Sequence, residues 1–354
     1  DPATQQITRV LMTKIPYTAF VLPTSNEFNF TDGLEQRYDV NSLDSREKTL
    51  FNKLNTIGNS EETLLVQAID EMMGHQYANV QQRIFETGNL LNKEFGYLRN
   101  EWETKSKDSN KIKIFGMKGN YKTDTAGIID YKNKAYGFVY LNENETVKLG
   151  ELSGWYLGAV KNKFDFSDIG GSKEEQNIVK AGAYKSMPLG KDHDNKLNWT
   201  VAAEGFFGTG DVSRKFLVVD DIFEAKSQFR SYGLGLRNEI RKNIRTSERT
   251  TISPYGSLKM EYGRFSGIKE DTGQVRLEIK SNDYYSIKPE VGVEFKYKQP
   301  IAVRTTFTAK LGLAYENELG KVGDVNNKAR VRHTTADWFS IRGEKDDRRG
   351  NGKV

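Results

Sequence analysis

The sequence contains no cysteine, only three histidines and only seven prolines among its 354 residues. The absence of cysteine excludes disulfides, thiolate metal sites and cysteine nucleophiles. The histidines, His75, His193 and His333, lie far apart, and none has a second ligand at metal-binding spacing. Apolar runs of about 18 residues, which a transmembrane helix needs, are missing as well. We therefore expect no covalent cross-link, no metal and no cofactor.

Charge of either sign is not concentrated anywhere in the chain. Lys and Arg together number 53 and Asp and Glu 48, which gives a formal net charge of +5. No basic block with interleaved aromatics marks a nucleic-acid surface, so we expect no nucleic-acid partner. Ser153 lies in a strand-like run and not at a strand-to-helix elbow, and no other hydrolytic constellation stands out. The sequence thus indicates no enzyme.

Alternation of apolar and polar side chains is what the sequence has in abundance. In "YYSIKPEVGVEFKYKQPIAVRTTFTAKLGLAY", residues 284–315, most odd positions are apolar and most even positions are charged, small or polar. A period of two over this length predicts two half-buried strands joined by a short turn near 298–300. The same alternation recurs in 196–208, 225–242 and 250–265.

From residue 111 onward the chain indicates strands only. The nine expected strands are 112–120, 134–142, 147–161, 176–186, 196–208, 225–242, 250–265, 284–297 and 301–316. Several are much longer than the five or six residues usual in soluble sheets. The expected long connections are 121–133, 162–175, 209–224, 266–283 and 317–350, and the shorter ones are 143–146, 187–195, 243–249 and 298–300. Long and short connections that alternate are typical of outer-membrane barrels, with the long ones extracellular.

Alternation alone does not decide which face meets lipid. A soluble barrel would turn its apolar side inward, and a membrane barrel would turn it toward lipid. Strand length, tyrosines at the ends of the apolar face and mixed charges on the other face favour the membrane barrel. The expected lipid-facing residues are Tyr285, Val291, Val293, Phe295, Tyr297, Phe307, Leu311, Leu313 and Tyr315. The expected lumen-lining charges are Arg237, Glu239, Lys259, Glu261, Lys288, Glu290, Glu294, Arg304 and Lys310.

Residues 60–105 are expected to form one or two helices. Asn59 or Ser60 is a candidate N-cap, and apolar residues follow at helical spacing. Most of the stretch is polar, so a surface helix and a helix inside a charged lumen both remain open, and the lumen is favoured. The expected lumen-helix residues are Gln82, Arg83, Glu86, Asn89 and Asn92. Before this helix, 1–23 contains strand-like runs broken by prolines, and 24–48 is polar and irregular.

These features, in this order, resemble a known family. A polar helix is followed by "GELSGWYLGAVKNKFDF", "KAGAYKSMP", "WTVAAEGFFGTG", "YGLGLRNEI" and "ISPYGSLKMEYGRFSG". Over about 58–354 the chain resembles the C-terminal translocator of classical type V autotransporters, and most closely that of large adhesins from Gram-negative anaerobes. The resemblance implies a barrel of 12 antiparallel transmembrane strands around a lumen helix, which anchors an N-terminal passenger. Since only nine strands are visible and the chain ends in NGKV, we expect this barrel to be incomplete.

The resemblance also implies a domain division and a set of partners. Residues 1–57 would be the end of the passenger or a stalk or autochaperone-like segment, 58–110 the linker helix and 111–354 the barrel. The implied partners are outer-membrane lipid, the chain's own passenger, the barrel assembly machinery, periplasmic chaperones, and host or bacterial surface ligands bound by the passenger. In some family members a linker-helix asparagine cyclises and releases the passenger, for which Asn79, Asn89 and Asn92 are candidates. The alternatives are an open porin and a soluble ligand-binding barrel with a helical module.

Overall fold

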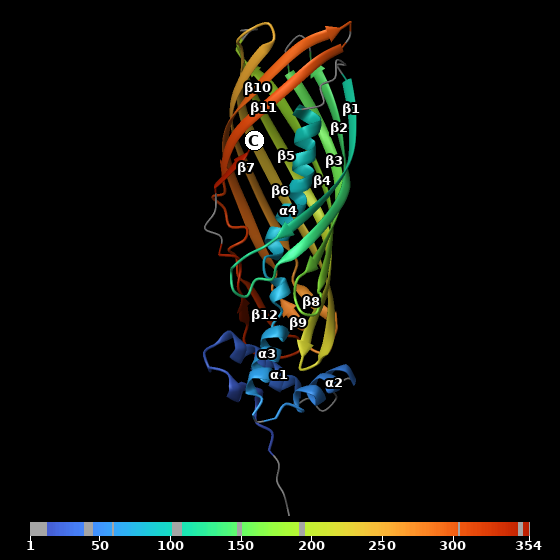
Figure 1. The fold of residues 1–354 in the computed structure, drawn as a ribbon, viewed down its shortest axis with the longest axis vertical. Coiled ribbons are helices and arrows are strands. Elements are labelled where there is room, and N and C mark those ends of the chain that lie inside the picture. The colour runs from blue at the N-terminus through green and yellow to red at the C-terminus, as the bar shows by residue number, and fades with distance from the viewer. Residues whose placement is uncertain are drawn as a thin grey trace, which may run out of the picture.

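The computed structural model describes residues 13–38, 45–58, 60–100, 108–146, 151–190, 195–303, 305–345 and 350–353. Figure 1 shows a tall, curved sheet with one helix running along its inside and a group of helices at one end. Among the described residues, no helix is long and apolar enough to cross a membrane.

The sheet is an antiparallel meander. Its long strands are β1 (Asp108–Tyr121), β2 (Tyr131–Thr146), β3 (Glu151–Phe166), β4 (Lys173–Leu189), β5 (Asn195–Val218), β6 (Asp221–Arg245), β7 (Thr250–Phe265), β10 (Asn282–Ala302) and β11 (Thr305–Asn317). They lie side by side in the order β1-β2-β3-β4-β5-β6-β7-β10-β11, and the short β14 (Gly350–Lys353) follows β11. All nine predicted strands and their antiparallel order are confirmed, except that 147–150 of the third predicted strand lie outside the described residues. Over the described residues the sheet does not close, since β1 and β14 form its two edges.

Three predicted connections are wrong, and the first is 143–146, because β2 continues to Thr146. Residues 209–224 are not a long loop, because β5 continues to Val218 and β6 begins at Asp221. The turn expected at 298–300 lies later, since β10 continues to Ala302 with a register irregularity after Pro300. The other predicted loops are shorter than expected, and 266–283 and 317–350 contain short strands of their own.

A single long helix occupies the inside of the curved sheet. The predicted helical region consists of α3 (Glu62–Met72), the short η2 (His75–Tyr77) and α4 (Val80–Asn100). Helix α4 contacts β1, β2, β3, β4, β7 and β10, so the sheet surrounds it on several sides. Leu91 and Leu98 are fully buried, and the ring centroids of Phe95 and Tyr156 on β3 lie 4.3 Å apart. The sequence-based choice of a helix inside the sheet is confirmed.

The N-terminal region is helical, contrary to the expectation from sequence. Instead of strand-like runs, residues 13–23 contain η1 (Tyr17–Phe20), and the stretch expected to be irregular contains α1 (Asn26–Tyr38) and α2 (Ser45–Leu54). The Ser25 hydroxyl accepts a hydrogen bond from Phe28 N at 3.2 Å and caps α1. Phe30 and Leu34, four residues apart on one face of α1, are fully buried. Their burial against another part of the chain stabilises a helix whose own sequence is mostly polar.

Helix α1 is buried against a layer formed by two long loops, 266–281 and 318–345, at the end of the sheet where the N-terminal helices lie. The loops form β8 (Ile268–Thr272), β9 (Leu277–Ile279), β12 (Asn327–Val331) and β13 (Phe339–Ile341). Helix α1 packs on β12 and β13, where the rings of Phe30 and Phe339 meet edge to face with centroids 5.8 Å apart. We call this assembly of η1, α1, α2 and α3 with the loops 266–281 and 318–345 the cap. It covers the lower end of the sheet in Figure 1.

Candidate functional site

The inner wall of the sheet carries buried charges that are paired with one another. Lys180 on β4 is completely buried, and its Nζ lies 3.0 Å from Glu204 on β5 and 3.2 Å from Glu261 on β7. Tyr156 donates to Glu204 at 2.9 Å, and Tyr284 donates to Glu261 at 2.8 Å. This cluster ties five strands together (β3, β4, β5, β7 and β10) and leaves neither carboxylate without a donor.

Two further carboxylates gather several cations each. Glu239 on β6 is buried and faces Arg237 at 2.5 Å, Arg241 at 3.2 Å and, from α4, Arg99 at 3.7 Å. Glu290 on β10 lies 2.9 Å from both Lys259 and Lys353. A buried carboxylate is stable only when it is paired and hydrogen-bonded. The pairs therefore hold the wall in register and link it to the helix.

Buried arginines fix the point where the chain enters the lumen from the cap. Arg83 in α4 donates to Glu174 on β4 at 2.7 Å and to the carbonyl oxygens of Gln76 at 2.9 Å and Ala78 at 2.6 Å. Arg83 thus joins the turn before α4 to the sheet wall, and both charged side chains are buried.

A second cluster lies where η2 meets β5 and β8. Arg214 pairs with Glu270 at 2.6 Å, and Tyr77 donates to Glu270 at 2.8 Å. Both charged side chains are fully buried. Burial, and then the charge of Glu270, raise the pKa of Tyr77 well above its ordinary value, so this hydroxyl keeps its proton. The cluster connects the cap to the lumen end of the sheet.

The residues predicted for the lumen helix all lie in α4, and their side chains meet the wall in different ways. Glu86 accepts a hydrogen bond from Tyr131 at 3.1 Å and from Gln82 at 2.9 Å. Asn92 accepts from Lys180 at 3.1 Å, and Asn89 lines the cavity described below. Together with Arg83, Glu86 and Asn92 thus link the helix to the wall, whereas Gln82 donates within the helix.

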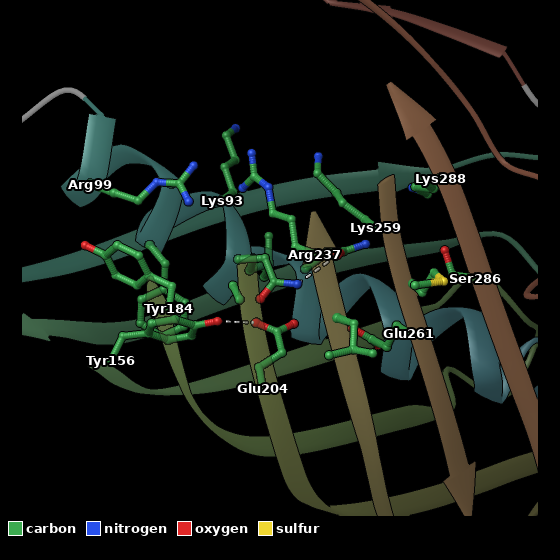
Figure 2. A pocket seen from close by; sticks show the side chains of 18 of the residues that line it. Lys93, Arg99, Tyr156, Tyr184, Glu204, Arg237, Lys259, Glu261, Ser286 and Lys288 are labelled. Atoms are coloured by element: carbon green, nitrogen blue, oxygen red, sulfur yellow. Dashed lines mark hydrogen bonds between the residues drawn. The ribbon is translucent and has the colours of Figure 1, made fainter. Parts of the chain in front are cut away.

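A cavity of about 660 Å³ remains between α4 and the wall. In Figure 2 the basic side chains of Lys93, Arg99, Arg237 and Lys259 stand on one side of it, and Glu204 meets Tyr156 on the other. The lumen is therefore only partly filled by the helix. Among the described residues, no group of three or more acidic or histidine side chains could hold a metal ion.

The predicted lumen charges lie on the inward face wherever the structure describes them. Besides the clusters above, Lys288 lies 3.8 Å from Glu316, and Glu294 lies 3.4 Å from Arg241. Lys310 is half-buried on β11, and Arg304 lies outside the described residues. The sequence reasoning missed several deeply buried charges of the wall, which are Lys111, Glu143, Glu174 and Lys180. All four alternate with outward residues on β1, β2 and β4, so extending the alternation to those strands would have found them.

The predicted lipid-facing residues lie on the opposite, outward face of β10 and β11. Val291 is 63% exposed and Leu311 54%, which is unusual for aliphatic side chains in a sheet. Val293 is half-buried. The same outward surface continues around the sheet as an exposed apolar belt. Its further members are Ile112, Ile114, Tyr136, Phe138, Trp155, Leu157, Val179, Trp199, Phe207, Tyr232, Leu234, Leu236, Ile240, Leu258 and Tyr262.

The belt ends abruptly toward the cap. On β5 the outward residues change from Trp199, Val201 and Phe207 to Thr209 and Asp211, while the inward ones become apolar and pack beneath the cap. On β6 the change falls at the matching place, where Arg230 faces Thr209 and Tyr232 faces Phe207. The outward faces of β5 and β6 therefore change at this level, which is the boundary of the belt. They are apolar within the belt and polar from there toward the cap.

Comparison with known proteins identifies the family in which this arrangement of strands and helix occurs. A family model described as "Autotransporter beta-domain" matches residues 111–354, which is more than half of the chain. The chain belongs to the autotransporter beta-domain family. Comparison with curated proteins gave no significant match.

A solved structure supports the fold of this autotransporter beta-domain. The sheet with its helix is similar to the translocator domain of the autotransporter NalP from Neisseria meningitidis, with a TM-score of 0.55 and 12% sequence identity. The match covers 73% of this chain and 88% of the NalP chain. At this identity the likeness supports the fold alone. The family itself makes the chain an outer-membrane domain that translocates a passenger, which decides against the soluble ligand-binding barrel and the open porin.

Proposed function

We propose that this autotransporter beta-domain anchors an N-terminal passenger, of the adhesin kind, and lets it reach the cell surface through the lumen. The observation that carries the proposal is the path of the chain. Helix α4 lies inside the sheet, joins β1 at one end, and meets η2, α3 and the cap at the other. A chain that runs through the lumen in this way connects the two sides of the membrane.

The orientation follows from the connections. The cap end carries the long loops 266–281 and 318–345, whereas β6–β7 and β10–β11 are joined at the other end by short turns. Outer-membrane barrels place long loops outside and short turns in the periplasm. The cap would then be extracellular, and the start of β1 would face the periplasm.

Each part of the chain has a role in this proposal. The exposed apolar belt would face lipid, and the paired inner charges would hold α4 as a plug. Residues 1–57 would be the membrane-proximal end of the passenger, 58–110 the linker and 111–354 the barrel. Barrel assembly machinery and periplasmic chaperones would deliver the chain, and surface ligands would bind through the passenger.

Protease accessibility on intact cells tests the proposal. An epitope placed before residue 13 should be removed by external protease without permeabilising the cells, while a periplasmic marker should survive. A cysteine introduced at Gly171, in the connection between β3 and β4, should likewise react with an impermeant label on intact cells. Reaction only after permeabilisation would contradict the orientation, and an epitope that is never accessible would contradict passenger exposure.

A further inference from the structure

Three lysines stand directly opposite one another on the outer face of β1, β2 and β3. Lys118 pairs in register with Lys134, and Lys134 pairs with Lys163. All three side chains are exposed and lie on the same outward face as the apolar belt. Like charges directly opposite on neighbouring strands destabilise a sheet. We call these three residues the lysine row.

The row is poorly neutralised by the protein itself. Lys163 lies 3.5 Å from Glu175 on β4, which also pairs with the neighbouring Lys161. Within the described part of the chain, Lys118 and Lys134 form no ion pair. The exposed Lys132, which faces Asp165 in register, adds a further positive charge beside them.

The rest of the same boundary is built differently. On β7 and β10, Tyr262 donates to Asp283 at 3.1 Å and Arg264 donates to Ser281 at 3.0 Å. On β5 and β6, Gln228 donates to Asp211 at 2.8 Å. There, polar side chains satisfy each other within the protein. Arg230 and Arg264 also lie at this boundary, but they face Thr209 and Tyr232, so among the strands compared only β1, β2 and β3 place like charges in direct register at this level.

The position of the row relative to the belt identifies what could neutralise it. On β2 the next two outward residues after Lys134 are Tyr136 and Phe138, both exposed members of the belt. On β1, Ile114 of the belt is 82% exposed. Lipid tails against these side chains would bring their headgroups to the level of the row, where lysines extend toward phosphate.

We propose that the lysine row binds the phosphate groups of an anionic glycolipid in the leaflet at the cap end. The occupant is a lipid and not a free anion, because the charges are continuous with the belt on which its acyl chains would lie. The proposal rests on the belt facing lipid, as set out under the proposed function. The phosphates relieve the repulsion between the lysines, so binding and sheet stability are coupled.

The test measures binding of diphosphoryl lipid A to the full chain in detergent micelles. We expect the triple variant Lys118→Gln, Lys134→Gln, Lys163→Gln to bind at least about tenfold more weakly than the unmodified chain. Lipid A without phosphates should bind weakly to both. A matched control removes three exposed lysines elsewhere, Lys226→Gln, Lys242→Gln and Lys269→Gln, and should change affinity less than about twofold.

Heat stability separates a binding role from a structural one. In detergent without lipid A, the row variant should be as stable as the unmodified chain or more so, because repulsion is relieved. Only the unmodified chain and a triple Lys→Arg variant should gain stability when lipid A is added. If the triple Gln variant does not fold, the single change Lys134→Gln should still weaken binding several-fold.

Three results would overturn the proposal. These are equal binding by the unmodified chain and the row variant, equal binding of phosphorylated and dephosphorylated lipid, and full displacement of the lipid by millimolar inorganic phosphate. Passenger exposure on cells is measured independently, so failure here would leave the proposed function standing.

Discussion

At the scale of single residues, the lumen depends on charges that are buried only because each has a partner. Lys180 is the clearest case, since it lies between Glu204 and Glu261 with no exposed surface. Replacing Lys180 by Met should leave two buried carboxylates facing each other. We expect the free energy of unfolding to fall by about 3–5 kcal/mol, which is the usual cost of removing one partner of a buried ion pair. Urea unfolding of the protein in detergent micelles measures it.

The control is a lysine on the same strand that points outward. Lys185 pairs with Glu151 at 3.0 Å, but half of its side chain is exposed. Lys185→Met should cost no more than about 1 kcal/mol, because exposed pairs contribute little. Similar losses for the two variants would show that the lumen cluster is not the stabilising contact that its geometry indicates.

Tyr77 gives a second test at this scale, in the junction between cap and lumen. Its hydroxyl donates to Glu270 and lies 2.9 Å from Ser227, all in a fully buried setting. Tyr77→Phe should therefore lower the free energy of unfolding by about 0.5–1.5 kcal/mol, the usual contribution of one hydrogen bond, since Arg214 still donates to Glu270. Tyr97→Phe is the matched change on α4, where the tyrosine is 46% exposed, and it should be nearly neutral in the same unfolding measurement. Equal effects would contradict the coupling of cap and lumen through Tyr77.

At the scale of elements, alternation predicted the strands well but not their full length. Along β5 the apolar residues shift from odd positions, such as Phe207, to even positions, such as Val212 and Phe216. The strand continues, but its outside passes from an apolar surrounding to a polar one while its inside meets the cap. In a single sequence such a shift resembles the end of a strand, which is why 209–224 was expected to be a loop.

The edge of the apolar belt predicts that two positions on the outward face of β6 differ in how well they tolerate an arginine. Leu234 on β6 is 71% exposed within the belt, and Gln228 lies on the same face beyond it. Leu234→Arg should cost about 2–4 kcal/mol and impair membrane assembly, as a charge does deep in the lipid face of a barrel. Gln228→Arg should assemble normally, because Asp211 lies opposite it. Gel electrophoresis of membrane fractions with and without heating measures how much of each variant is folded in the membrane. Equal folded amounts of the two variants would contradict a lipid-facing belt.

We expect a glycine-to-alanine substitution to have opposite effects on stability at two glycines in the helices. A Cβ on Gly33 of α1 would lie 2.8 Å from Cβ of Val331 on β12, whereas a Cβ on Gly96 of α4 would meet nothing within 4 Å. Gly33→Ala should lower the free energy of unfolding of the cap by about 1–3 kcal/mol, although alanine has a better helix propensity than glycine. Gly96→Ala should stabilise the protein by up to about 1 kcal/mol. Pulse proteolysis in urea measures both, and a stabilising Gly33→Ala would mean that α1 does not pack closely on β12.

At the scale of the whole molecule, the fold was predictable and the cap was not. The order of long alternating strands after a polar helix indicated the architecture, because period and loop length are local properties. The cap joins α1 to loops some 300 residues away, as in the hydrogen bond from Ser340 N to Asn26 at 2.9 Å. Nothing in the polar sequence of α1 identifies those partners. The pairing of Lys180 with carboxylates on two other strands depends in the same way on sheet curvature that a single sequence does not give.

The last prediction concerns the helix as a plug. Because α4 lies inside the sheet and is held there by Arg83, Asn92 and Arg99, its removal should open the lumen. Deleting 60–100 should raise single-channel conductance in planar bilayers several-fold over the full chain. Deleting 13–57 removes most of the cap helices but leaves α4 in place, so its conductance should stay close to that of the full chain. Equal conductance for the full chain and the 60–100 deletion would mean that the lumen conducts past the helix, and α4 would then be a passive tether with no sealing role.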